Sequence, residues 1–318
     1  MPESLQDLVV LMPVYEDREA CLCLLHHLDA HVRGPYTVVV VDDGSRTNPF
    51  TPPGEVHPNR HLHLLRLNRN LGHQAAISIG LQYIAQHVSA RQHVIVMDSD
   101  GEDAPQAINT LAASLEDHFD VAVASRGKRN DGPLFQTLYL GYKALFLCLT
   151  GQCMNFGNFM LLRGSAVQRL CTMSTLPRHL AGTVLASGLR VHKVQVNRGR
   201  RYAGRSKMNL RTLVRHGMAS LAVLGPVAQQ RLATAKRVCA GVALLCSLYW
   251  GGMAAAGSRQ ASELLPALAA VQMAAALGAA ILATLSARLA QPHAIPPARW
   301  RLEKPFPAAV DNAGAFSA

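Results

Sequence analysis

Two aspartates that follow an apolar run are the residues best placed to do chemistry in this sequence. Asp98 and Asp100, separated by Ser99, come directly after Val94–Met97. If that run is a buried strand, both carboxylates lie where the strand ends and the chain turns. Mg²⁺ and Mn²⁺ favour such oxygen ligands, above all when a diphosphate completes the coordination shell. The plainer alternative is that these acids cap the helix that follows.

The elements that must position these acids alternate along the first half of the chain. The expected strands are 8–12, 37–41, 63–67, 93–97 and 121–125, and the expected helices are 18–31, 74–87 and 105–117. This alternation predicts an α/β fold with a mostly parallel sheet, in which ligands bind beyond the carboxyl ends of the strands. Asp42–Ser45, Asn68–Gly72 and Asp98–Asp103 all fall at such ends.

The charges of this 318-residue chain are unevenly distributed around a net charge of +11. Residues 1–131 carry 17 acids and 10 bases, whereas residues 132–262 carry 17 bases and no acid. A basic region can serve nucleic acid, an anionic membrane face or a polyphosphate. The acid-free region cannot supply a carboxylate base or metal ligand, so any such group must come from residues 1–131.

Two long uncharged segments lie near the C-terminus. Val238–Gly257 and Leu264–Ala287 are each long enough to cross a hydrocarbon core of about 30 Å, and 258–263 joins them. Basic residues flank the pair on both outer sides, so the positive-inside rule places both flanks in the cytoplasm. A buried helical hairpin of a soluble domain is the alternative. The apolar positions before the pair have helical spacing and predict a basic amphipathic helix at the headgroups, with an ordinary surface helix as the alternative: Leu210, Leu213, Val214, Met218 and Leu221.

Several motifs, taken in order, resemble those of the family-2 glycosyltransferases: Pro13–Asp17, Val41–Ser45, Asn68–Gln74 and Asp98–Asp100. Within that family the chain most resembles the polyprenyl-phosphate glycosyltransferases, such as dolichyl-phosphate mannosyltransferase and the bacterial bactoprenol glucosyltransferases. Three further segments carry this closer resemblance: Ser125–Asp131, Gly157–Leu162 and Arg201–Lys207. Together the motifs cover about residues 8–215.

The resemblance implies a Rossmann-like GT-A fold, a UDP- or GDP-linked sugar donor and a Mg²⁺ or Mn²⁺ ion. It implies that Asp98 and Asp100 hold the metal, with Glu102 as a further candidate ligand, and that Arg126 and Arg129 act with them in catalysis. The residues implied for donor nucleotide binding are Pro13, Val14, Tyr15, Asp17, Asp42, Asn70, Gly72 and Ser99. Those implied for the diphosphate and the acceptor phosphate are Arg126, Arg129, Arg201, Ser206 and Lys207.

Three positions depart from the family's pattern. Glu16 stands where Asn is usual, and Glu102 stands where Gln is common. Asn158 replaces an Asp that many members carry. Glu102 leaves the metal coordination open, and Asn158 removes a charge that could orient an arginine.

The lack of acids in residues 132–262 helps to predict which acceptor is used. Transfer to a hydroxyl needs a general base, whereas a phosphate monoester is already anionic and needs cations to approach the donor. We therefore expect direct attack by a polyprenyl phosphate, such as undecaprenyl phosphate, with inversion at the sugar carbon. A hydroxyl lipid or another glycan acceptor is the alternative.

Three other classes of protein fit less well. Gly199–Ser206 approaches a P-loop, but Arg205 replaces its lysine. Aromatic residues are only 5%, which is poor for stacking nucleic-acid bases, so no nucleic-acid partner is expected. A scaffold without activity gives no reason for the two aspartates and the arginines together.

These expectations combine into one layout. A catalytic GT-A domain spans residues 1–208, a basic juxtamembrane segment 209–236, two transmembrane helices 237–288 and a flexible cytoplasmic tail 289–318. The chain is expected in the inner (cytoplasmic) membrane as a multi-pass protein, with the catalytic domain and both termini in the cytoplasm. The small residues of both spans favour helix packing and a homo-oligomer.

Overall fold

A computed structural model describes residues 8–54, 57–126, 133–203, 210–257, 260–290 and 300–303. The chain divides into two compact units. The first comprises 1–136, 154–223 and 294–318, and the second comprises 137–153 and 224–293. Arg129, Ser206 and Lys207, predicted to bind phosphates, lie outside the described residues, and only the backbone of Arg126 is described.

The first unit is built on one mixed sheet of eight strands, in the order β7-β5-β6-β4-β1-β2-β3-β8. Pairing is parallel in β1–β2, β1–β4, β2–β3 and β5–β7, and only β6 and β8 run against the other strands. The strands are β1 Leu8–Val14, β2 Tyr36–Asp42, β3 Arg60–Leu67, β4 His93–Val96, β5 Val121–Arg126, β6 Phe156–Arg163, β7 Val191–Val196 and β8 Trp300–Glu303. The predicted α/β fold with a mostly parallel sheet is confirmed.

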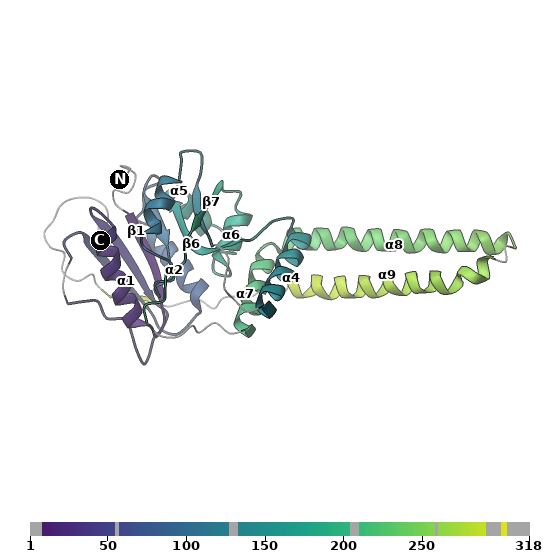
Figure 1. Cartoon of the computed structure of the whole chain (residues 1–318), viewed down its shortest axis with the longest axis horizontal. Helices are drawn as coiled ribbons and strands as arrows, with labels where there is room; N and C mark the ends of the chain where they lie inside the picture. Colours follow the sequence, from purple (N-terminus) through teal and green to yellow (C-terminus); the bar gives the residue numbers. More distant parts are fainter. Residues whose placement is uncertain are drawn as a thin grey trace. The chain divides into compact units, whose positions relative to one another are not determined.

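Helices cover both faces of this sheet (Figure 1). Successive side chains of a strand point to opposite faces, so the apolar residues of one strand pack against helices on both sides. Leu8, Val10 and Met12 of β1 belong to a core cluster that includes buried residues of α1 and α3. Val9 and Leu11 belong to a second cluster, with buried residues of α2, α5 and α6. The helices are α1 Arg18–His31, α2 His73–Ala85, α3 Ala107–Ala113, α5 Gly164–Cys171 and α6 Leu180–Ala186.

One further helix of the first unit, α7 (Leu210–Val223), packs near α6. A Cβ added at Gly182 of α6 would lie 3.3 Å from the Val223 side chain. Leu221 is buried, whereas Val214 and Met218 are exposed. The stripe predicted for this helix is therefore split, because Leu221 belongs to the packed face and the other two do not.

The second unit is helical and contains residues 137–150 of α4 (Pro133–Thr150), together with α8 (Gly225–Ala255) and α9 (Gln260–Ala290). α8 and α9 run side by side (Figure 1), and Gln272 Nε2 donates a hydrogen bond to Ser247 Oγ at 2.5 Å. Among the described residues, α8 alone is long and apolar enough to cross a membrane, by length and composition. α9 contains Pro266, and its apolar stretch over Ala269–Ile281 is shorter.

The elements that were not predicted from the sequence include α4, β6, α5, α6 and β8. α4 was not predicted, although its sequence is apolar and free of acids. β8 pairs antiparallel with β3, with Leu64 opposite Glu303. The prediction of a flexible tail over residues 289–318 did not include this strand.

Candidate functional site

The parallel strands bring three acidic turns to one edge of the sheet. Val14 of β1 is in register with Asp42 of β2, which is in register with Arg66 of β3. Leu11 of β1 is in register with Val96 of β4, so Asp98 follows on the same side. This is the edge at which ligands bind in open α/β sheets.

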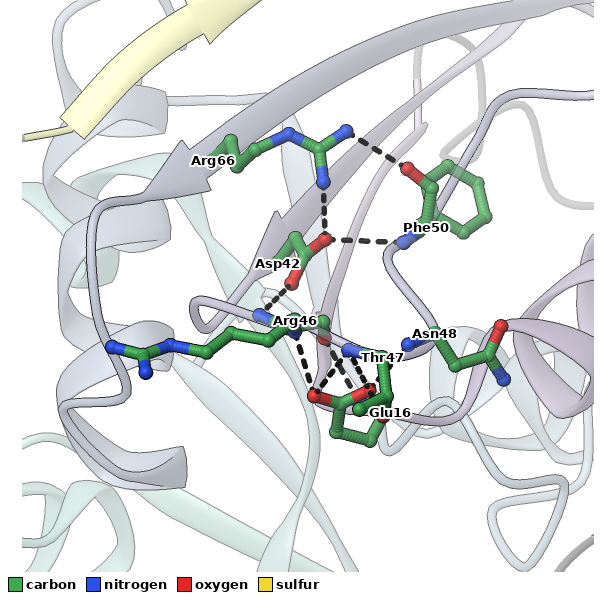
Figure 2. Close-up of polar contacts among 8 residues, drawn as sticks. Glu16, Asp42, Arg46, Thr47, Asn48, Phe50 and Arg66 are labelled. Atoms are coloured by element: carbon green, nitrogen blue, oxygen red, sulfur yellow. Dashed lines mark hydrogen bonds and ion pairs between the residues drawn. The ribbon is translucent and has the colours of Figure 1, made fainter.

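Asp42, the last residue of β2, is fully buried and accepts hydrogen bonds from three donors (Figure 2). The backbone N–H groups of Ser45 and Phe50 donate to it at 2.9 and 3.1 Å, and Arg66 Nη1 donates at 2.6 Å. Arg66 Nη2 also donates to the Phe50 carbonyl at 3.0 Å. These bonds fill most of the roughly four acceptor positions of a carboxylate, so Asp42 first of all shapes the loop that follows β2.

Glu16 holds the same loop from the other side (Figure 2). Its carboxylate accepts from the backbone N–H groups of Arg46 and Asn48, both at 2.6 Å, and from the Thr47 hydroxyl at 2.6 Å. The Thr47 hydroxyl and then the Arg46 N–H lower the pKa of Glu16 to about 2. Glu16 adopts a φ of 48°. Together with Asp42, Arg66 and residues 45–50, it forms what we call the Asp42 cluster.

Asp43 holds the motif Asn68–Gln74 in place. Its carboxylate accepts from the backbone N–H groups of Leu71 at 2.7 Å and Gly72 at 2.9 Å. Burial raises the pKa of this carboxyl. Gly72 has a φ of 94° and precedes α2, so a glycine suits this position.

The loop after β4 carries the second group of carboxylates. The N–H of Asp98 donates to the buried Asp103 carboxylate, and the N–H of Glu102 donates to Asp100, both at 2.9 Å. Burial, and then the neighbouring charge of Asp98, raise the pKa of Asp100. His73 Nε2 lies 3.2 Å from Asp98 Oδ1.

Arginines from the acid-free region meet this loop. Arg201 pairs with Asp17 at 3.2 Å and with Asp100 at closer range, and Arg198 pairs with Glu102. The two arginines together with Asp17, Asp98, Asp100 and Glu102 form what we call the Asp100 cluster. Asp17, predicted to bind the nucleotide, is thus brought to the predicted metal ligands.

The described residues contain no group of three or more acids, histidines or cysteines arranged to hold a metal ion. The possible ligands are the carboxylates of Asp98 and Asp100, and burial and then the charge of Asp98 raise the pKa of Asp100. Mg²⁺ is commonly held by one or two carboxylates together with substrate phosphates. The residues therefore fit a cation that arrives with, or is completed by, a diphosphate.

The other predicted nucleotide-binding residues lie along the same edge. Val14 is buried, Ser99 is largely buried, and Asn70 is exposed. Tyr15 is 41% exposed. Pro13 is a buried residue of β1.

A polar chain that was not predicted from the sequence links α2, β6 and α6. Gln74 Nε2 donates to Asn158 Oδ1 at 3.1 Å, and the Leu180 N–H donates to Gln74 Oε1 at 2.6 Å. Asn158 Nδ2 lies 3.0 Å from His73 Nε2. The only sequence signal was that Asn158 departs from the family's pattern.

A histidine pair, of which His179 is buried and His216 half-buried, joins α6 to α7. His179 Nδ1 accepts from the Gly182 N–H at 3.0 Å, so in the neutral ring the proton sits on Nε2 and is directed at His216 Nε2, 3.0 Å away. Burial, and then His216, lower the pKa of His179 to about 3. Because His179 Nδ1 is an acceptor, its Nε2 has no lone pair for a metal, and the pair is a hydrogen bond between elements.

Residues 9–171 match glycosyl transferase family 2, just over half of the chain. The chain belongs to glycosyl transferase family 2. The α/β architecture with its mostly parallel sheet is the GT-A fold expected for this family.

Two curated relatives of this family-2 chain carry the same name. The undecaprenyl-phosphate 4-deoxy-4-formamido-L-arabinose transferase of Yersinia enterocolitica is 26% identical over 222 residues, which cover 67% of this chain and 65% of the relative. The enzyme of that name from Pectobacterium atrosepticum is 26% identical over 198 residues, covering 61% and 54%. The matches thus span less than two thirds of the relatives' own length.

Similar solved structures are more distant. The mannosyltransferase PcManGT from Pyrobaculum calidifontis, solved with GDP-Man and Mn²⁺, has a TM-score of 0.43 and 18% identity, covering 90% of this chain and 87% of that one. TarS from S. aureus, residues 1–349 with UDP-GlcNAc, has a TM-score of 0.42 and 14% identity, covering 72% and 71%.

Proposed function

We propose that this chain transfers a sugar from a UDP- or GDP-linked donor to a polyprenyl phosphate such as undecaprenyl phosphate. The observation that carries the proposal is the ion pair between Asp100, in the loop after β4, and Arg201 from the acid-free region. Family membership and the names of the curated relatives support the same reaction.

Each group of residues has a distinct task in this proposal. Asp98 and Asp100 would hold Mg²⁺ or Mn²⁺, and Glu102 is a further candidate ligand. When bound, the cation would stabilise the negative charge of the leaving nucleoside diphosphate. The Asp42 cluster shapes the loop that borders the nucleotide, and the exposed residue Tyr15 is a predicted contact of the nucleotide. Arg201 and the predicted Arg126, Arg129, Ser206 and Lys207 supply donors for phosphate oxygens.

The transfer itself is a single displacement. An oxygen of the lipid phosphate forms a bond to the sugar C1, the bond from C1 to the donor diphosphate breaks, and the nucleoside diphosphate leaves with the electron pair. No protein base is required, because the phosphate oxygen is already anionic. A single displacement inverts C1, which NMR of the lipid-linked product measures.

A membrane location follows from the proposed acceptor. The side chains of Val238, Leu245 and Leu248 on α8 are exposed, as expected of a helix that faces lipid. We propose that α8 crosses the cytoplasmic membrane, that α9 returns through it, and that the catalytic unit and both termini are cytoplasmic. A homo-oligomer formed through these helices remains a prediction.

The test is a donor panel with purified full-length protein in detergent. UDP- and GDP-sugars are offered with undecaprenyl phosphate or with undecaprenol, and the lipid-linked sugar is measured. We expect transfer to the phosphate lipid alone, lost in Asp100→Asn and kept in Asp120→Asn, whose carboxylate pairs with the exposed Arg190. Transfer to undecaprenol alone would refute the proposed acceptor.

A further inference from the structure

One guanidinium sits among three carboxylates in the Asp100 cluster. Arg201 Nη1 lies 3.2 Å from Asp17, Nη2 contacts Asp100, and Nε lies 4.0 Å from Glu102. These side chains are between 12 and 21% exposed, so the charges are only partly screened by water. Arg201 is therefore the cation that balances Asp100 in this structure.

The backbone around Arg201 is fixed to the loop that carries Asp100. The Tyr202 N–H donates to the Asp100 carbonyl, and the Gly199 N–H donates to the Glu102 carbonyl, both at 2.9 Å. A Cβ on Gly199 would lie 2.3 Å from the Gly101 carbonyl oxygen, so the two segments are in direct backbone contact. Arg201 can consequently change partners by turning its side chain while its backbone stays in place.

The hydrogen-bonding capacity of Arg201 is not exhausted. Its Nε is buried and, within the described part of the chain, has no hydrogen-bond acceptor. A guanidinium has five N–H donors in a fork that matches phosphate oxygens. The donors present here suit an anion with several oxygens better than the divided set of carboxylates that Arg201 contacts.

We propose that Arg201 is a resident counter-cation of Asp100, which exchanges this carboxylate for the donor's diphosphate when a divalent cation binds. The proposal rests on the proposed function and deepens it. Two cations cannot share one carboxylate without repulsion, so Arg201 and the metal ion compete for Asp100. A diphosphate relieves this competition because it offers Arg201 another anion.

This exchange couples the metal to the nucleotide. Mn²⁺ alone binds weakly because it must displace Arg201 from Asp100. A nucleoside diphosphate strengthens Mn²⁺ binding, and by linkage Mn²⁺ strengthens nucleotide binding by the same factor. Removing the guanidinium has opposite effects on the two ligands: it favours the metal alone and disfavours the nucleotide.

The experiment is calorimetric titration of the purified full chain with Mn²⁺, alone and with saturating UDP or GDP. We expect Arg201→Gln to bind Mn²⁺ alone about tenfold more tightly than the wild type, a typical size for coupling between sites. The same variant should bind UDP or GDP more weakly, and the nucleotide should no longer strengthen Mn²⁺ binding. Arg201→Lys keeps the charge but loses the fork, so its Mn²⁺ affinity should stay near that of the wild type.

Arg190→Gln is the matched control. It removes one arginine from an exposed pair with Asp120, which directly precedes the first residue of β5. The substitution should leave Mn²⁺ affinity unchanged. Unchanged or weaker Mn²⁺ binding in a folded Arg201→Gln protein would overturn the exchange, as would equal tightening in Arg190→Gln. These titrations need no turnover, so a failure of sugar transfer to undecaprenyl phosphate shows in the transfer assay alone.

Discussion

The Asp42 and Asp100 clusters lie at the same edge of one sheet, but they shift the pKa of a carboxyl group in opposite directions. In the Asp42 cluster, backbone N–H groups and Arg66 donate hydrogen bonds to the carboxylates, and the pKa of Glu16 falls to about 2. In the Asp100 cluster, burial and then the neighbouring charge of Asp98 raise the pKa of Asp100. The first arrangement is complete without a ligand, whereas the second leaves negative charge that a further cation would relieve.

This difference separates stability from function. A carboxylate that is satisfied within the fold stabilises the fold, and its removal exposes unpaired donors. A carboxylate whose ionised form is disfavoured by burial and by a like charge contributes less to the stability of the fold. Substitutions in the Asp42 cluster should therefore lower the melting temperature, whereas substitutions in the Asp100 cluster should lower sugar transfer.

The largest effect should follow Asp100→Asn. We expect sugar transfer to fall by about 10²–10³-fold, the usual cost of removing one electrostatic contact to developing charge, while the melting temperature does not fall. The raised pKa means that the fold destabilises the ionised carboxylate, so the neutral amide costs little stability. A large drop in melting temperature would show that the Asp100 cluster is as structural as the Asp42 cluster.

Asp42→Asn should have the reverse profile. It weakens the pair with Arg66 at a fully buried position, and we expect the free energy of unfolding to fall by about 3 kcal/mol. For a unit of this size the melting temperature should drop by roughly 6–12 °C. Thermal melting of Asp42→Asn, with Asp120→Asn as the control, measures this loss of stability. Equal melting temperatures of the two variants would contradict the role given to Asp42.

Gly44→Ala tests how tightly the turn after β2 is packed. Gly44 has a φ of +71°, and a Cβ there would lie 2.4 Å from the Arg69 carbonyl carbon. Gly34 has a φ of +87° with nothing within 4 Å, so Gly34→Ala isolates the cost of the backbone conformation. We expect a loss of about 1 kcal/mol for Gly34→Ala and clearly more for Gly44→Ala, and equal melting temperatures would disprove the contact.

The smallest effect should be the pH dependence conferred by Glu16. Its pKa is lowered from 4.5 to about 2 in the fold. Its contribution to stability is therefore complete above about pH 5 and is lost as the pH falls toward about 2. Melting temperature against pH should fall less steeply in Glu16→Gln than in the wild type. Glu116→Gln removes an exposed carboxylate and should leave the slope unchanged.

Sequence patterns located much of this architecture. The strand expected at 37–41 appears as Tyr36–Asp42, and the helix expected at 18–31 appears with those bounds. Both follow from local hydrophobic periodicity, which the sheet and its covering helices preserve. The helix α4 was not predicted, since its apolar residues are not confined to one face.

The partners of the acids could not be predicted in the same way. Arg201 and Asp17 are 184 positions apart in the chain, and Gln74 and Leu180 are 106 apart. No local pattern relates residues so distant, and the strand order that brings them together is a property of the whole sheet. The role of Glu16 could not be predicted either, because its partners lie in a loop about 30 residues away.

The sequence by itself determined the alternation of strands and helices, the position of Asp98 and Asp100 after a strand, and the absence of acids from residues 132–262. These are properties of composition and short-range periodicity, which a linear chain displays directly. Only the tertiary structure decided that Asp42 is satisfied within the fold and that Asp100 is crowded by Asp98 and paired with Arg201. The reason is that burial and charge proximity depend on distances between segments, and folding alone sets those distances.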